Sequence, residues 1–378
     1  MNEWKEFLIE DLAEFCNAKR VPLSSMQRQQ LQGSYPYYGA SGIVDYVNDY
    51  IFEGSHVLIS EDGENLKSRN TPIAFEASGK FWVNNHAHIL KAKEPHLTKI
   101  LIHYFAQLDL TPYLTGAVQP KLNKATLSKI PLYLPSSTAE QKAIASVLSS
   151  LDDKIDLLHR QNKTLEAMAE TLFRQWFIEE AKEDWEDKPL SSIATFTNGL
   201  ACQKYPPQPN EPKLPVLKIK DLTSGISDSS DWATANVDPK YIVNHGDVIF
   251  AWSASLMVKI WFGETCVLNQ HLFNVTSDEY PKWFFYQWCK YHLEEFISIS
   301  QSHATTMGHI KRKDLDEAIV KVPSQSELQK MTSSFEPLMD KLITNLKQIK
   351  TLENLRDTLL PKLMSGEVRV QYQTEEVA

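Results

Sequence analysis

Two segments of this chain carry apolar residues at alternating spacings of four and three positions, over residues 139–177 and again over residues 331–363. A 3.5-residue repeat keeps one narrow stripe of a helix facing a partner helix, so the pattern predicts two long coiled-coil helices. The stripe residues that carry this prediction are Leu151, Ile155, Leu158, Asn162 and Leu165 in the first segment, and Leu338, Leu342, Asn345, Ile349 and Leu352 in the second.

The two stripes complement each other if the helices run antiparallel. In that register Asn162 lies opposite Asn345, and Leu151 lies opposite Arg356. One buried polar pair lowers stability but fixes the register, because any slip leaves both amides without partners. A parallel arrangement, two separate bundles, or packing of each stripe on its own globular domain remain as alternatives.

The segment that precedes each helix is duplicated. Lys-Thr-Leu-Glu occurs at residues 163–166 and 350–353, and Asn-Asn-His at 84–86 corresponds to Asn-Gln-His at 269–271. Short strand-like runs, such as 57–59 and 248–250, recur in the same order with one amphipathic helix, at 97–108 and 283–296. The sequence therefore predicts an α+β fold: two tandem domains of many short strands plus helices, separated by two long antiparallel helices and related by a pseudo-two-fold axis.

The pattern also gives domain boundaries. We expect a first domain at residues 1–137, a central helical region at 138–180, a second domain at 185–323, a C-terminal helical region at 324–366 and a tail at 367–378. Pro337 lies inside the second helical region, and proline removes a helical hydrogen bond. We therefore expect a short helix followed by a long one over residues 337–364, with a corresponding division of the first region near 149–150.

Composition limits the class of protein. With 378 residues, 42% hydrophobic and 23% charged, the chain is typical of a folded globular protein of two or three domains. It has no run of 18 apolar residues, and residues 1–10 lack the features of a signal peptide. The four scattered cysteines are expected to be reduced, buried thiols of a cytoplasmic protein without a membrane partner.

The net charge of −9 argues against nucleic-acid binding only as a total. A binding surface needs a local field, and Lys121, Lys124 and Lys129 lie in a stretch without acidic residues from 115 to 137. The charge of the chain is therefore segregated along the sequence.

Catalytic and cofactor motifs are absent from the sequence. It contains no phosphate-binding GxxxxGK[ST], no GxGxxG, no GxSxG, no HExxH and no paired CxxC. His86 and His88 could share a strand face, but no third ligand accompanies them, so we expect neither a metal site nor catalysis by this chain.

The loops of the two predicted domains contain residue types that contact DNA. Gln and Asn suit adenine, Lys and Arg suit guanine, and hydroxyls and amides suit phosphate. The alternatives are a solvated surface for the polar residues and core packing for the aromatic ones. The candidate DNA-binding residues are Tyr37, Tyr38, Lys67, Asn85, Gln119, Lys121, Asn123 and Lys124 in the first half, and Lys218, Lys220, Trp252, Ser253, Gln270, Thr305, Thr306, His309, Lys311 and Lys313 in the second.

The helical segments carry the most specific motifs. These are Glu-Gln-Lys at 140–142, Leu-Asp-Asp-Lys-Ile-Asp at 151–156, Leu-Glu-Ala-Met-Ala at 165–169 and Leu-Phe-Arg-Gln-Trp-Phe at 172–177. Together with the duplicated domain, they resemble the specificity (S) subunit of type I restriction–modification systems. The resemblance covers nearly the whole chain, although residues 336–342 match the helical motif more loosely.

The resemblance implies a non-catalytic DNA-recognition subunit. Each target-recognition domain would recognise one half of a bipartite site in double-stranded DNA, and the helices would set the spacer between the halves. The helices would also dock two methyltransferase subunits, which the restriction/translocase subunits join. S-adenosylmethionine, ATP and magnesium would belong to those partners, with no cofactor in this chain.

Two other functions stay open from the residues alone. One is the specificity chain of a different multi-subunit restriction–methylation enzyme. The other is a protein–protein scaffold whose two domains bind proteins instead of DNA. Salt-sensitive, sequence-dependent DNA binding would distinguish the scaffold from both DNA-reading alternatives.

Overall fold

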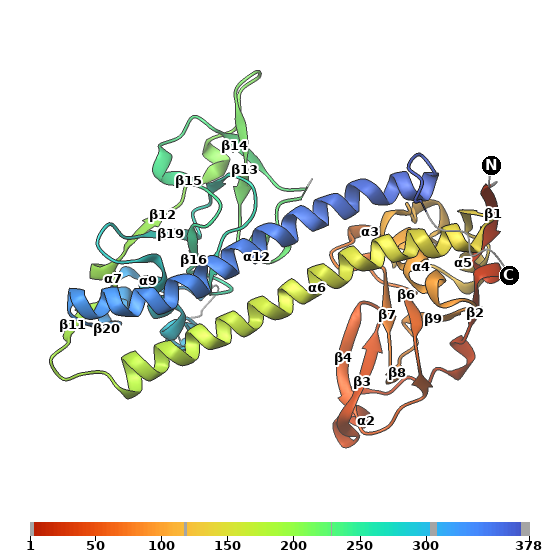
Figure 1. Ribbon diagram of the computed structural model, residues 1–378, viewed down its shortest axis with the longest axis horizontal. Coiled ribbons are helices and arrows are strands. Elements are labelled where there is room, and N and C mark those ends of the chain that lie inside the picture. Colours follow the sequence, from red (N-terminus) through yellow and green to blue (C-terminus); the bar gives the residue numbers. More distant parts are fainter. Residues whose placement is uncertain (1–3, 117–118, 228, 303–307, 372–378) are drawn as a thin grey trace. The chain divides into compact units, whose positions relative to one another are not determined.

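The computed structural model describes residues 4–116, 119–227, 229–302 and 308–371 (Figure 1). The chain divides into two compact units. Unit 1 comprises Met1–Lys154 and Leu352–Ala378, and unit 2 comprises Ile155–Thr351. The long helices α6 (Thr138–Arg174) and α12 (Gln325–Ser365) each contribute one part to unit 1 and the other part to unit 2.

The described part of unit 1 contains three small sheets. One is an antiparallel pair, β1 (Trp4–Leu8) with β10 (Pro131–Pro135). The second has the order β2 (Ala13–Phe15), β9 (Ala87–Ala92), β6 (His56–Ser60), β7 (Ala74–Ala77). The third has the order β4 (Gly42–Val47), β3 (Gln32–Gly39), β8 (Lys80–Val83), β5 (Phe52–Glu53). Its helices and helical turns are α1 (Ile9–Leu12), η1 (Asn17–Lys19), α2 (Ser25–Gln30), α3 (Asn65–Ser68), α4 (Pro95–Gln107), η2 (Thr111–Tyr113) and α5 (Lys124–Ser128).

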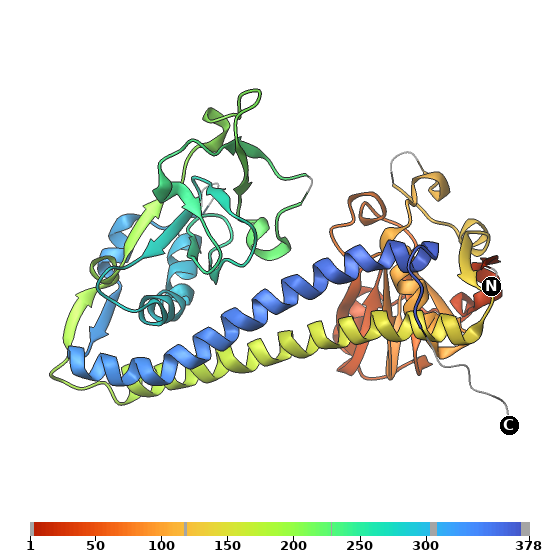
Figure 2. The ribbon, with the colours of Figure 1, turned by 45° about the horizontal axis from the view of Figure 1, so that its top comes forward.

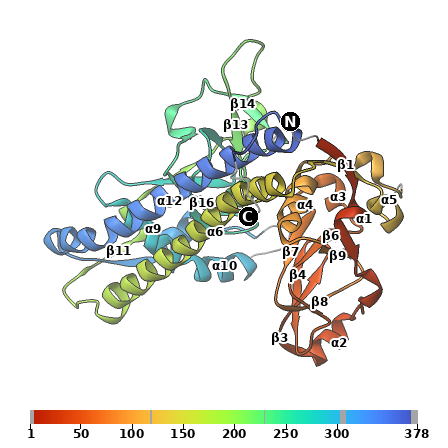
Figure 3. The same cartoon turned by 45° about the vertical axis from the view of Figure 1, so that its right-hand side comes forward.

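Strand β6 lies at the centre of the unit 1 core, and all its residues are buried. Because successive strand residues point to opposite faces, Val57 and Ile59 pack with the apolar face of α4, while Leu58 packs with the third sheet. Figure 3 shows α4 beside β6, β7 and β9. A strand that is covered on both faces has a continuous run of apolar residues. For this reason the apolar run at residues 57–59 correctly predicted a buried strand.

Unit 2 repeats this architecture strand for strand. Its antiparallel pair is β11 (Glu186–Pro189) with β20 (Ile319–Val322). The other two sheets have the orders β12 (Thr195–Asn198), β19 (Leu272–Thr276), β16 (Val248–Ala251), β17 (Met257–Ile260), and β14 (Trp232–Thr234), β13 (Lys213–Leu217), β18 (Cys266–Leu268), β15 (Ile242–Val243). Its helices and helical turns are α7 (Leu190–Ile193), η4 (Cys202–Lys204), α8 (Asp221–Ser224), η5 (Pro239–Tyr241), α9 (Lys282–Tyr291), α10 (Leu293–Ser302) and α11 (Arg312–Glu317).

The pairing pattern confirms the predicted duplication and the α+β fold. Among the described strands, each unit has a parallel pair at the corresponding place, β3 with β8 in unit 1 and β13 with β18 in unit 2. The single helix expected at 283–296 is wrong, because α9 and α10 meet at His292. This side chain turns toward β20, where Nε2 lies 3.1 Å from the Ile319 carbonyl oxygen. Of the cysteines, Cys202, Cys266 and Cys289 are buried as expected, whereas Cys16 is only half-buried.

The predicted breaks in the long helices are wrong. Helix α6 continues through residues 149–150 and ends in a π-helical turn, η3 (Gln175–Glu179). Helix α12 continues through Pro337. Because proline has no N–H group, the carbonyl oxygen of Ser333 has no helical hydrogen-bond donor at Pro337. Both residues are exposed, so water can donate to that oxygen. An interior proline costs about 3 kcal/mol, and burial of Phe335 and Leu342, at about 1.5–3 kcal/mol each, offsets it.

In unit 2, α6 and α12 run antiparallel (Figure 2). They pack through the predicted asparagine pair. Asn345 Nδ2 donates to Asn162 Oδ1 at 2.9 Å, and both side chains are buried. Leu158 and Leu342 are buried on either side of this pair. The hydrogen bond can form in only one alignment of the two helices, so it selects the register.

In unit 1, the same two helices meet around Asp152. Arg356, expected opposite Leu151, forms an ion pair with the neighbouring Asp152 at 3.2 Å. His103 of α4 lies 2.8 Å from the other carboxylate oxygen of Asp152. The two contacts of Asp152 join α4, α6 and α12. A separate apolar cluster of the two long helices lies beyond them: Ile144, Leu148, Leu360 and Leu363.

Single replacement of either asparagine is expected to destabilise unit 2. Asn345→Leu should lower the free energy of unfolding by about 1–3 kcal/mol, because it leaves the buried Asn162 amide unpaired. The double variant Asn162→Leu/Asn345→Leu should be as stable as the parent or more so, since apolar pairs stabilise such seams. Urea unfolding of the four proteins measures this, and a single variant as stable as the double one would contradict it.

Candidate nucleic-acid interface

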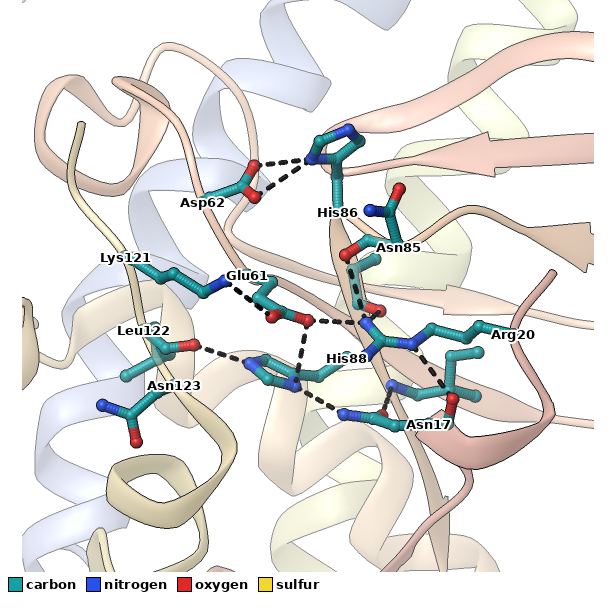
Figure 4. Close-up of polar contacts among 12 residues, drawn as sticks. Asn17, Arg20, Glu61, Asp62, Asn85, His86, His88, Lys121, Leu122 and Asn123 are labelled. Carbon is teal, nitrogen blue, oxygen red and sulfur yellow. Dashed lines mark hydrogen bonds and ion pairs between the residues drawn. The ribbon is translucent and has the colours of Figure 1, made fainter. Parts of the chain in front are cut away.

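The end of strand β6 in unit 1 lies beside loops from distant parts of the chain (Figure 4). Glu61 follows β6, and its amide donates to the His86 carbonyl oxygen at 2.9 Å. On the other side the Leu122 amide donates to the Glu61 carbonyl oxygen at 2.8 Å. We call this group the strand-end cluster of unit 1; it comprises Asn17, Arg20, Glu61, Asp62, Asn85, His86, His88, Lys121 and Asn123.

His88 is a buried imidazole that ties β9 to the loop carrying Lys121. The Ile89 amide donates to Asn17 Oδ1 at 2.9 Å, so Asn17 Nδ2 is the donor to His88 Nδ1 at 2.8 Å. Because Nδ1 accepts, we assign the proton to Nε2, which donates to the Leu122 carbonyl oxygen at 2.7 Å. Burial lowers the pKa of His88, in agreement with a neutral ring.

Glu61 is the half-buried anion of this cluster. Arg20 Nη1 lies 2.5 Å from Glu61 Oε2, and Lys121 Nζ lies 3.3 Å from Oε1. Burial opposes ionisation of Glu61, but the hydrogen bond and charge of Arg20 outweigh it, so its pKa is lowered. Arg20 also donates to the carbonyl oxygens of Asn17, Asn85 and Ala87, which fixes the guanidinium in place.

The outer layer of the cluster is accessible to a ligand. His86 Nδ1 lies 2.9 Å from Asp62 Oδ1, with the imidazole half exposed. Asn85 is exposed, and the Lys121 side chain is 51% exposed. Gln119 and Lys67 are exposed on the adjoining loop and on α3.

The buried histidines predict loss of unit 1 stability in mild acid. Burial lowers the pKa of both His88 and His56, so below about pH 6.5 the unfolded chain binds protons that the folded chain does not. The free energy of unfolding should fall by up to about 1.4 kcal/mol per pH unit for each histidine until its folded pKa is reached. His88→Phe should remove one of these contributions. Urea unfolding at pH 7.5 and 5.5 tests this, and an unchanged pH dependence in the variant would contradict it.

Unit 2 has the same backbone connections with different side chains. The Ile310 amide donates to the Trp252 carbonyl oxygen at 3.1 Å, and Ser253 bridges to His309, as Asp62 does to Lys121. By strand pairing, the equivalents of Asn17, Glu61, Asp62, Asn85, His86, His88 and Lys121 are Asn198, Trp252, Ser253, Gln270, His271, Phe273 and His309. We call these residues of unit 2 the strand-end cluster of unit 2.

The cluster of unit 2 is aromatic where that of unit 1 is ionic. The Trp252 ring stacks on Phe273 with centroids 5.6 Å apart, and its Nε1 donates to Asn198 Oδ1 at 3.2 Å. Ser253 Oγ lies 3.1 Å from His271 Nδ1. The two units therefore offer different chemistry at the same place in the fold.

A cleft of about 870 Å³ opens beside the strand-end cluster of unit 2. Its lining brings together three predicted residues, Lys218, Lys220 and Gln270, with Gln203, Asp231 and Trp232. Lys218 forms an ion pair with Asp231. Trp232 is 42% exposed, and the Lys213 ammonium lies 4.9 Å from the centre of its ring. Exposed cations of this kind suit the phosphates of DNA.

Among the predicted DNA contacts, Tyr37 is wrong. Its side chain is 1% exposed, and its hydroxyl accepts from the Leu23 amide at 2.9 Å, so it belongs to the core. Tyr38 is half-buried against Phe75 and Phe81. Ser253 is also buried, with its hydroxyl directed to His271, so neither Tyr37 nor Ser253 can meet a base directly.

Four of the candidate residues lie at the start of a short helix, α5 in unit 1 or α11 in unit 2: Asn123, Lys124, Lys311 and Lys313. Asn123 Oδ1 accepts from the Thr126 amide at 2.9 Å and thereby caps α5, whose first residue is Lys124. Lys311 lies at the equivalent start of α11, where Lys313 pairs with Glu317 at 3.0 Å. Thr305 and Thr306 lie outside the described residues.

Sequence reasoning missed Asn17, Arg20, Glu61 and the internal role of His88. The available signal was a histidine inside the apolar strand run at 87–90, since a buried imidazole requires polar partners. Its partners come from residues 17 and 122, and no local pattern identifies them.

Metal binding and membrane insertion are two other functions that the described residues bear on. Within residues 4–116, 119–227, 229–302 and 308–371, no group of three or more His, Cys, Asp or Glu side chains is arranged to hold a metal ion. Over the same described ranges, no helix combines the length and apolar character that crossing a membrane requires.

Comparison with known proteins agrees with the fold. A family model described as "Type I restriction modification DNA specificity domain" matches residues 1–167 and again residues 182–354. The MjaIX specificity subunit of Methanocaldococcus jannaschii is 26% identical over 98% of this chain and 94% of its own length. The EcoDI specificity subunit of Escherichia coli is 21% identical over 91% of this chain and 84% of its own. The solved S subunit of M. genitalium matches with a TM-score of 0.58 over 96% of each chain at 16% identity, which supports the fold.

These matches define the class first: a chain built from two DNA-specificity domains in tandem. The chain belongs to the type I restriction–modification DNA specificity family. It is a specificity subunit, a class of chain that recognises DNA and leaves catalysis to other subunits.

Proposed function

We propose that the two strand-end clusters are the DNA-reading surfaces of this specificity subunit, each recognising one half of a bipartite double-stranded site. The observation that carries the proposal is their equivalence, since the same backbone connections hold the corresponding loops of both units at the end of the corresponding strand. Asn85 and Gln270 are such a pair, and carboxamides suit the adenine edge in the major groove.

The remaining organisation follows from the duplicated chain. We assign the first target-recognition domain to residues 1–137 and the second to 185–323, with the helical regions at 138–180 and 324–366 and the tail at 367–378. The helices would set the number of unread base pairs between the half-sites, as spacing does in other two-part readers. Their outer faces would dock two methyltransferase subunits.

The chemistry would reside in partner chains. S-adenosylmethionine would bind the methyltransferase subunits, and ATP and magnesium the restriction/translocase subunits that join them. Extruding and methylating a base would therefore occur outside this chain, in the cytoplasm where the genome is accessible.

Methylome sequencing of cells that express this chain with its cognate methyltransferase tests the proposal. We expect one split motif with methylated adenine in each half, absent when this chain is omitted. Exchange of residues 186–323 for the second domain of another specificity subunit should change one half of the motif only. If an active methyltransferase yields no motif that depends on this chain, the DNA-reading function is wrong and a protein scaffold takes its place.

A further inference from the structure

The backbone that carries Lys121 is fixed before any ligand binds. Lys121 exchanges two hydrogen bonds of 2.8 Å with Thr115, and the Gly63 amide donates to the Pro120 carbonyl oxygen at 3.0 Å. The neighbouring Leu122 is held by Glu61 and His88, as described above. Only the side chain of Lys121 remains to be placed, and it is the long, flexible type that loses most rotamer entropy on binding.

Glu61 is the group that places this side chain. Its carboxylate bonds Arg20 through one oxygen and Lys121 through the other (Figure 4). The two cations differ in accessibility, because the Arg20 side chain is 17% exposed and that of Lys121 is 51% exposed. The other hydrogen bonds of Arg20 go to the carbonyl oxygens of Asn17, Asn85 and Ala87. Arg20 therefore stays inside the cluster and neutralises Glu61, so the positive charge of Lys121 is the net charge of these three side chains.

The second unit lacks this arrangement. Trp252 stands in the place of Glu61, and His309 in that of Lys121. The pairing of Glu61 with Lys121 is therefore specific to the strand-end cluster of unit 1, and the fold does not require it.

We propose that Glu61 is a positioning residue that holds the Lys121 ammonium ready for an acceptor oxygen of double-stranded DNA at the half-site of unit 1. The inference rests on the proposed DNA-reading function and adds to it the residue that sets selectivity there. Preorganisation of Lys121 lowers the entropy cost of the correct contact, while contacts with phosphates elsewhere on DNA require the ammonium to leave Glu61.

The acceptor oxygen can belong to a phosphate or to guanine. A phosphate contact contributes to affinity for every sequence and adds about 0.9 to the slope of log affinity against log salt. A guanine contact contributes at one base pair of the target. Lys121→Ala distinguishes the two sources, because it should either flatten the salt dependence or relax one position of the motif.

The experiment uses the full chain in complex with its methyltransferase, on target and non-target duplexes between 50 and 200 mM salt. Glu61→Gln should lower the preference for target DNA roughly tenfold and steepen the salt dependence by about one unit, since the net charge of the cluster becomes more positive by one. Glu61→Asp keeps the charge but shortens the reach to Lys121. It should lower the preference while the salt slope stays unchanged.

A double variant makes the coupling measurable. If Glu61 acts through Lys121, Glu61→Gln/Lys121→Ala should show the same preference as Lys121→Ala alone. Glu76→Gln is the matched control, because Glu76 pairs with Lys99 at 3.1 Å elsewhere in unit 1. It should leave the preference for target DNA unchanged.

The outcomes separate this inference from the function on which it rests. Additive losses in the double variant, or an unchanged preference in both Glu61 variants, would overturn the role of Glu61. Thermal unfolding of each variant identifies a loss caused by misfolding. Lys121→Ala then carries the test, since the side chain of Lys121 is more exposed than that of Glu61 and its backbone bonds to Thr115 are kept. If the parent complex shows no preference for any target, the DNA-reading function fails whatever the variants do.

Discussion

Phe177→Ala should lower the free energy of unfolding of unit 2 by about 3–5 kcal/mol. Phe177 lies in the π-helical turn that follows α6, and its side chain is 1% exposed. Its ring contacts several aromatic residues, with centroid distances of 4.9 Å to Phe173, 5.4 Å to Trp185 and 5.5 Å to Phe284. These rings come from separate elements and cannot all move inward, so a cavity remains and the cost is large.

Tryptophan fluorescence during urea unfolding measures this effect, because Trp185, Trp283 and Trp288 all lie around Phe177. Ile178→Ala is the control: the adjacent side chain is 36% exposed, and its loss should cost less than about 1 kcal/mol. Equal effects of the two substitutions would show that Phe177 does not anchor the end of α6.

Arg369→Ala should lower the free energy of unfolding of unit 1 by about 3 kcal/mol, the lower end of the range for breaking a buried ion pair. Arg369 bonds Glu140 in bidentate fashion, with distances of 2.7 and 2.6 Å, and Glu140 is 1% exposed in the first turn of α6. The substitution removes the guanidinium that neutralises a carboxylate withdrawn from water. Because Arg369 itself is 43% exposed, we place the cost at the lower limit.

A second substitution distinguishes charge from contact area. In Arg369→Ala/Glu140→Gln the buried charge is gone, so part of the lost stability should return. Lys362→Ala serves as the control, since its pair with Glu367 at 3.8 Å is exposed and should contribute less than about 1 kcal/mol. If the double variant is no more stable than Arg369→Ala, the buried charge is not the cause.

The features that were predictable from sequence are those with a local period. The four-three spacing placed Asn162 opposite Asn345 because every seam residue repeats the same geometric constraint. The duplicated order of strands followed from short apolar runs such as residues 57–59, which are buried on both faces.

The features that were missed depend on contacts remote in sequence. The local sequence around Pro337 predicted a break in the helix. The break is absent because Pro337 lies on the exposed face of α12, and which face meets the core depends on distant residues. The sequence does not determine whether Tyr37 is buried. Its burial depends on a partner for its hydroxyl, which is the amide of Leu23. The ionic network of Glu61 joins residues 20, 61 and 121, which the sequence separates by many residues and only the folded sheets bring together.

The pairing of the first and last strands of each domain has a consequence for how such chains diversify. Trp4 lies opposite Pro135 in β1 and β10, and Glu186 lies opposite Val322 in β11 and β20. The chain therefore enters and leaves each domain at one place, and residues 136–137 or 323–324 alone connect it to the following helix. The segment between the paired strands can therefore change in length without moving the two points at which the chain enters and leaves the domain.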